Sequence, residues 1–182
     1  RELFDCGVHG PDIFFYDLNH SDIAGYGTAM HHEPSKPFFE NCIKVYRENN
    51  EDKQAMMSYI LGFLSHFAFD SQAHGYINTK DRVTEGLSHN KIEAEYDGHL
   101  MRKDGRSINL TDRGESLKPD KKNAEIIARF FPFPRIAINL VFKTLIRKNF
   151  CKTSFVLHYC LIKTFGNFCI FPVVKKIFAM KH

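Results

Sequence analysis

Residues 52–74 read DKQAMMSYILGFLSHFAFDSQAH, and this stretch decides the class of fold. Its apolar side chains recur every three or four residues, which is the period of an α-helix that buries one broad face. They are Met56, Met57, Tyr59, Ile60, Phe63, Leu64, Phe67 and Ala68. The spacing therefore predicts a long helix with a wide apolar stripe.

The segments on either side show the same helical period. We expect further helices near residues 24–32, 38–48, 89–101 and 121–131, the last of them broken by Pro132. No segment keeps an alternation of apolar and polar residues for long, as a half-buried β-strand would. The sequence therefore predicts an all-α protein built as a multi-helix bundle.

The composition is that of a folded domain. Of the 182 residues, 43% are hydrophobic, which argues against disorder, and the net charge of +4 does not by itself indicate a nucleic-acid partner. The five cysteines include no CxxC pair, so a disulfide scaffold is not expected. Residue 1 is Arg rather than Met, and we expect the natural amino terminus to lie upstream. The compartment, cytoplasmic or secreted, and the oligomeric state stay open.

The charges divide the chain into two segments. All 21 acidic residues lie at or before Glu125, whereas residues 126–182 carry ten Lys or Arg and ten of the eighteen Phe. We expect residues 1–125 to form one region, which the family resemblance given below implies is catalytic, and residues 126–182 to form a basic, Phe-rich helical segment packed on the same domain. The basic segment could also contact an anionic membrane surface from one side. Because Lys163 interrupts its longest apolar run, no membrane-spanning helix is expected.

The predicted long helix also carries metal-ligand types. His66, Asp70 and His74 are spaced by four residues, and each step moves the side chain only about 40° around the helix axis. The three therefore form one polar stripe beside the apolar face. By contrast, we expect Asp97, His99 and Asp104, further along the chain, to lie on a solvated face.

The same ligand types recur on either side of this stripe. His89 and Glu93 repeat the four-residue spacing, and Asp12 and the pair His31-His32 lie upstream. Imidazole and carboxylate are ligands that zinc and similar divalent cations take. A lone buried His is usually structural, and an isolated helical His–Asp pair is usually a surface contact. So many donors within residues 12–93 favour a metal site instead.

Four segments in order extend this prediction: GPDIFFY at 10–16, MHHEPSKPFF at 30–39, YILGFLSHFAFDSQAH at 59–74 and HNKIE at 89–93. Together they resemble the zinc-dependent phospholipase C family, which includes bacterial phospholipases C and the catalytic domain of alpha-toxin. The resemblance covers roughly residues 1–105. It implies a helical bundle with its metal cluster in a cleft between helices.

The resemblance also implies a ligand set. One zinc would be held by Asp12, His31, His66 and Asp70, with His32 as the alternative to His31. A second would be held by His74, His89 and Glu93. Asp12 would orient or deprotonate the attacking water as well, and Asp70 would bridge towards a third zinc. The third site in the family uses a Trp and a nearby His that this chain does not match, so two zinc ions are expected.

The activity implied is zinc-dependent hydrolysis of a phosphodiester, with a phospholipid yielding diacylglycerol and a phosphorylated head group. One alternative is a single-strand nuclease on the same scaffold. Residues 1–105 are not notably basic, so nucleic acid is not the expected partner. Another alternative is a non-catalytic or truncated relative that binds metal or membrane, which the missing third-site ligands would suit.

Overall fold

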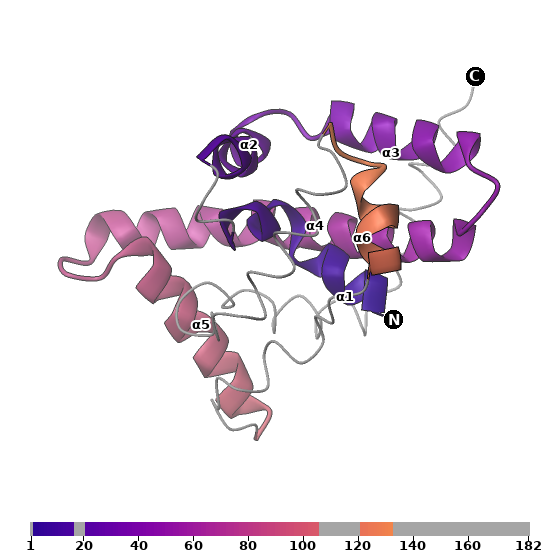
Figure 1. Cartoon of the computed structure of the whole chain (residues 1–182). Helices are drawn as coiled ribbons and strands as arrows, with labels where there is room; N and C mark the ends of the chain where they lie inside the picture. The colour runs from indigo at the N-terminus through magenta and orange to yellow at the C-terminus, as the bar shows by residue number, and fades with distance from the viewer. Residues whose placement is uncertain (1, 17–20, 106–120, 133–182) are drawn as a thin grey trace.

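The computed structural model describes residues 2–16, 21–105 and 121–132, and these residues are entirely helical apart from their turns (Figure 1). The elements are α1 (Glu2–Val8), the 3-10 helix η1 (Gly10–Tyr16), α2 (Ser21–His32), α3 (Lys36–Glu48), α4 (Lys53–Val83), α5 (His89–Lys103) and α6 (Lys121–Ala128). The described ranges contain no strand. The prediction of an all-α fold is confirmed.

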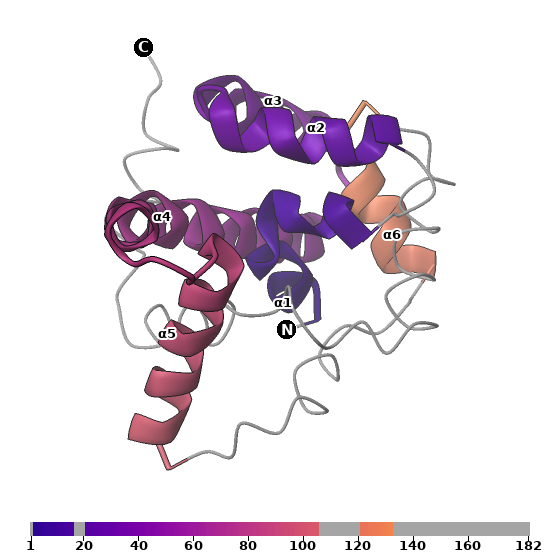
Figure 2. The same cartoon turned by 90° about the vertical axis from the view of Figure 1, so that its left-hand side faces the viewer.

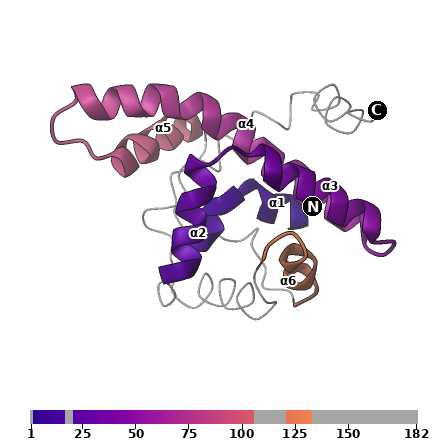
Figure 3. The same cartoon turned by 90° about the horizontal axis from the view of Figure 1, so that it is seen from above.

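The long helix α4 is the element on which the others are assembled. Its 31 residues span about 46 Å at 1.5 Å per residue. Helices α2 and α3 lie on one side of it, and α5 leaves its far end and projects from the other side (Figures 1 and 2). Seen from above, α6 lies near the opposite end of α4 from α5 (Figure 3).

Helix α4 is longer than residues 52–74, the stretch expected from the sequence. It continues to Val83 because the extra turns have a core of their own: Ile77 is fully buried and packs with Ile92 of α5. Lys80 and Arg82 in the last turn also interact favourably with the negative end of the helix dipole.

Helix α1 was not expected, because seven residues are too few for a helix to be stable alone. Its stability comes from a close crossing with α4, where Gly7 faces Gly62. A Cβ atom at Gly7 would collide with the backbone oxygen of Tyr59, and one at Gly62 with that of Phe4. The two glycines therefore allow the helix backbones to touch.

Two apolar clusters hold the described helices together. The main core joins α1, η1, α2, α3, α4 and the α6 region, and its largest fully buried side chains include Phe14, Tyr59 and Phe130. The smaller cluster joins α4 to α5 through Ile77 and Ile92. None of the helices in the described ranges has both the length and the apolar character needed to cross a bilayer.

The structure bears on two further expectations, the exposure of Asp97 and the division of the chain at residue 125. Asp97 is fully buried on the inner face of α5, together with Gly98 and Met101, so its expected exposure was wrong. Helix α6 runs across residue 125, and Lys122 and Arg129 on either side of that point pair with Asp52 at 3.1 and 3.5 Å. The division at 125 stays a prediction, because residues 133–182 lie outside the described part of the chain.

Candidate metal centre

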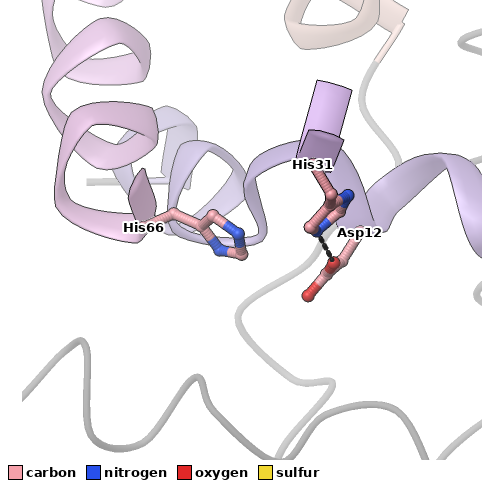
Figure 4. Close-up of side chains that lie close together, drawn as sticks. All are labelled: Asp12, His31 and His66. Carbon is pink, nitrogen blue, oxygen red and sulfur yellow. Dashed lines mark ion pairs between the residues drawn. The ribbon is translucent and has the colours of Figure 1, made fainter. Parts of the chain in front are cut away.

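Asp12, His31 and His66 form a first donor group (Figure 4). They come from η1, the last turn of α2 and the middle of α4, and one potential ligand atom of each lies within 4.8 Å of the others. Nε2 of His31 is 3.0 Å from Oδ1 of Asp12. His31, and not the neighbouring exposed His32, takes part in this group.

The backbone fixes both imidazole rings of the first donor group. The Nδ1–H of His66 donates to the carbonyl oxygen of Val8 at 3.0 Å, and that of His31 donates to Gly27 at 2.7 Å. A donated Nδ1–H leaves the lone pair on Nε2, which is the arrangement that metal-binding histidines adopt. Gly10, at a φ of 53°, packs against the His66 ring so closely that a Cβ atom there would overlap it.

His74, His89 and Glu93 form a second donor group, again with one potential ligand atom each within 4.8 Å. It is built from the end of α4 and the first turns of α5. Oε1 of Glu93 is 3.0 Å from Nε2 of His89 and 3.9 Å from Nε2 of His74. The two imidazole rings lie 5.2 Å apart at an interplanar angle of 33°.

Asp70 lies on α4 midway in sequence between His66 and His74. It accepts the Nδ1–H of His74 at its carboxylate oxygen (2.9 Å) and at its backbone oxygen (3.1 Å). The charge of Asp70 also contributes to raising the pKa of His31 and of Glu93, so Asp70 acts electrostatically on both donor groups. The geometry thus shows Asp70 orienting His74, and its place as a ligand beside Asp12, His31 and His66 stays a prediction.

Neighbouring charges and burial shift the pKa of residues in both donor groups. Burial lowers the pKa of His31, but the hydrogen bond and charge of Asp12 outweigh burial and raise it overall. The hydrogen bond to Asp70 is the main cause that raises the pKa of His74 to about 9. Burial raises the pKa of Glu93, although His89 and His74 oppose the shift.

Zinc fits both donor groups on their chemistry and spacing. Each group offers two imidazoles and one carboxylate, which is a common zinc ligand set with a position left for water or substrate. Ligand atoms at about 2.0–2.1 Å from a tetrahedral zinc lie about 3.3 Å from each other. In the second group the separations of 3.0 and 3.9 Å bracket that value, and in the first group Nε2 of His31 and Oδ1 of Asp12 are 3.0 Å apart.

A groove with a volume of about 830 Å³ runs along α4 beside these groups. Four of the residues expected at the site line it, namely His31, His66, Asp70 and His74. The connection between α2 and α3 and residues 129–132 after α6 also line it. The expected cleft between helices is therefore present.

Some partners of the donor groups could not be found in the sequence. The carbonyl of Val8 is 58 residues away from His66, and no local pattern links them. The ring of Phe15 stacks on His31 at 5.4 Å, although nothing in the spacing of these two residues indicates the contact. By contrast, the four-residue spacing of Gly27 and His31 is a helical signal that could have been used.

An all-helical bundle with two imidazole–carboxylate groups, of which His31, His66 and His74 line one groove, defines a class of helical metal-binding protein. The family model for zinc-dependent phospholipase C matches residues 2–132, which is most of the chain. The chain therefore belongs to the zinc-dependent phospholipase C family, and the match extends beyond residues 1–105, where the sequence motifs lie. No curated protein and no solved structure matches it.

Proposed function

We propose that this protein hydrolyses the phosphodiester bond of a phospholipid, releasing diacylglycerol and a phosphorylated head group. The observation that carries the proposal is the placement of two donor groups on one face of α4. Their members His66 and His74 are eight residues apart, about 12 Å along the helix, and both line the same groove. Family membership supports zinc as the metal and a phospholipid as the substrate.

We assign one zinc ion to each donor group, two per chain. Asp70 supports both, by orienting His74 and by adding negative charge near His31 and Glu93. When bound, zinc supplies a Lewis acid for the phosphate oxygens and lowers the pKa of a bound water from about 15.7 towards 7.

Asp12 is the residue to which we assign the proton of the attacking water. Its side chain is 23% exposed, so water can reach it, and its Oδ1 is held 3.0 Å from the backbone-anchored His31. The carboxylate can therefore accept or orient a proton at a fixed position. The oxygen of water adds to phosphorus as its proton passes to Asp12, and the bond to the glycerol oxygen breaks. That oxygen takes up the proton held by Asp12 and leaves as the hydroxyl of diacylglycerol.

The proposal is tested by incubating the zinc-loaded chain with short-chain phospholipids that differ in head group and following phosphorus by NMR. Release of the phosphorylated head group together with diacylglycerol is the expected result. Cleavage of single-stranded nucleic acid without action on any phospholipid would contradict it. So would the absence of any hydrolysis by protein shown to contain zinc.

We also propose that residues 126–182 help to hold the enzyme on anionic membranes. The support is compositional: ten cationic and no anionic residues in 57 positions. A surface-near Lys or Arg contributes about 1 kcal/mol of binding to an anionic membrane. Binding to anionic vesicles should therefore weaken as salt is added, and equal binding to neutral and anionic vesicles would contradict this role.

A further inference from the structure

The face of α4 that lines the groove changes its chemistry along the helix axis. The residues on it follow a spacing of one, three or four: Phe63, His66, Phe67, Asp70, Ser71, His74 and Asn78. Phenylalanine occurs only in the first of these turns, and the last two turns are polar. The step from Phe63 to Asp70 covers about 10 Å of helix, so the two kinds of surface are adjacent.

Aromatic side chains from other elements complete the apolar part. Phe38 of α3 packs on Phe63 at 4.3 Å and on Phe131 at 5.4 Å, and both of these partners are buried. Phe39 contacts Phe67 at 5.7 Å. We call the part of the groove lined by Phe38, Phe63, Phe67 and Phe131 the aromatic end.

Phe67 is the side chain at the aromatic end whose position is not explained by burial in the core. It is 40% exposed, although the phenylalanine one turn earlier, Phe63, is 4% exposed. Its neighbour in sequence, His66, belongs to the first donor group, and Asp70 is one turn further on. An exposed aromatic ring beside candidate metal ligands is suited to contact an apolar part of a substrate.

We propose that the aromatic end binds the acyl chains and glycerol of the substrate, so that its phosphate lies beside His66 and Asp70. The head group then points towards His74 and Asn78. This assignment deepens the proposed function and rests on it. A phospholipid has one apolar and one charged part, and the groove offers matching surfaces in the same order.

The charges along the groove favour this direction over the reverse one. Arg129 borders the aromatic end, beside Phe130 and Phe131 in the sequence. It shares the single carboxylate of Asp52 with Lys122, so positive charge remains there that would repel a cationic head group. Glu33 lines the groove on the connection that follows His31 and His32, next to the first donor group. The aromatic end is therefore the poorer place for a quaternary ammonium group.

The test uses the full chain loaded with zinc and a series of monomeric diacyl phosphatidylcholines with increasing chain length. Each additional buried methylene should lower KM by up to about fourfold until the aromatic end is filled. Phe67→Ala should flatten this dependence. It should also lower the ratio of kcat/KM for dihexanoyl phosphatidylcholine to that for p-nitrophenyl phosphorylcholine, which has no acyl chain, by about tenfold.

Tyr76→Ala is the matched control. Tyr76 is also an exposed aromatic residue of α4, at 53%, but it does not line the groove and lies about 180° around the helix from Phe67. The ratio should not change in this variant. An equal loss with both substrates in Phe67→Ala would overturn the proposal, because it would place the head group at the aromatic end.

Binding of dihexanoylglycerol, measured by calorimetry, separates this inference from the proposed function. This ligand has acyl chains but no phosphodiester, so it cannot be hydrolysed by a phospholipase C. We expect the native chain to bind it and Phe67→Ala to bind about tenfold more weakly. Intact hydrolysis without such binding overturns the inference alone, whereas binding without hydrolysis of any phospholipid overturns the proposed function.

Discussion

Each donor group has one histidine on the same face of α4, His66 in the first and His74 in the second, but the two groups are built in different ways. The first draws Asp12, His31 and His66 from three elements that pack on the main core, and His66 is 2% exposed. The second draws its residues from the α4–α5 pair, and their side chains are 18–33% exposed. Among the described residues, its supporting cluster has two buried members, Ile77 and Ile92.

The two donor groups differ in how far they are formed before a metal binds. Long-range contacts such as that between His66 and Val8 fix the first donor group as part of the folded core. In the second, the described residues hold His74 near Glu93 by contacts between neighbouring turns, by the small α4–α5 cluster and by the ring contact of Tyr76 with Tyr96. We therefore expect the first group to be largely preformed and the second to be ordered in part by zinc.

The largest effect that tests this comparison is on catalysis. Asp12→Asn keeps the size of the side chain but removes its ability to take a proton. We expect kcat at saturating zinc to fall by about 10²–10⁴-fold, as measured by steady-state hydrolysis, and zinc to be held more weakly by the first donor group, which loses its carboxylate. Asp81→Asn, at an exposed position on α4, is the control and should retain full activity. Unchanged kcat in Asp12→Asn would remove the assigned role.

Removing zinc should change the hydrogen-exchange rates of the two regions to different extents. At a zinc concentration of 1,000 times Kd, binding protects a site by about 4.1 kcal/mol, or about a thousandfold in exchange rate. Chelation should therefore speed exchange in α5 by up to this factor, while α1 and the middle of α4 stay protected by the main core. Equal loss of protection in both regions would show that the groups are not independently built.

A substitution at Gly10 should destabilise the fold through the contact of this residue with the His66 ring of the first donor group. A Cβ atom at Gly10 would overlap the His66 ring, and Gly10 has a φ of 53° that disfavours other residues. We expect Gly10→Ala to lower the free energy of unfolding by about 1–3 kcal/mol. Gly75→Ala is the control, because a Cβ atom there meets nothing within 4 Å, and it should stabilise the helix by about 0.5–1 kcal/mol. Urea denaturation measures both, and a neutral Gly10→Ala would contradict the close contact.

The smallest effect concerns pH in the zinc-free protein. The pKa of His74 is raised to about 9, chiefly by its hydrogen bond to Asp70, so the folded state binds the proton more tightly than the unfolded state. This stabilisation is complete below about pH 6.5 and is lost as pH rises through about 9. His74→Gln should reduce that fall in the free energy of unfolding, and His99→Gln should not. A wild-type chain that becomes more stable between pH 6.5 and 9 would contradict the assignment.

The sequence predicted the parts of the fold that depend on local periodicity. The helical spacing of residues 52–74 and of 38–48 predicted the segments found in α4 and α3. It could not predict α1, because that helix depends on the contact of Gly7 with Gly62, 55 positions apart in the chain. It also could not predict the burial of Asp97, since the packing of α5 is set by tertiary contacts.

The candidate site was predictable for a different reason. Ligand residues on one helix, such as His89 and Glu93, are brought together by the four-residue period alone. The meeting of Asp12 with His31 came from the family resemblance, because these residues lie on separate elements, η1 and α2. The orientation of the rings and the aromatic end of the groove required the structure.

The central claim is that two separately built donor groups hold one zinc ion each. Elemental analysis of the purified chain after dialysis tests it most directly, together with one variant in each group. We expect two zinc ions per chain in the native protein. The single variants His31→Ala and His89→Ala should each hold one zinc ion per chain. Three zinc ions that resist dialysis, or loss of both ions in either variant, would contradict the account.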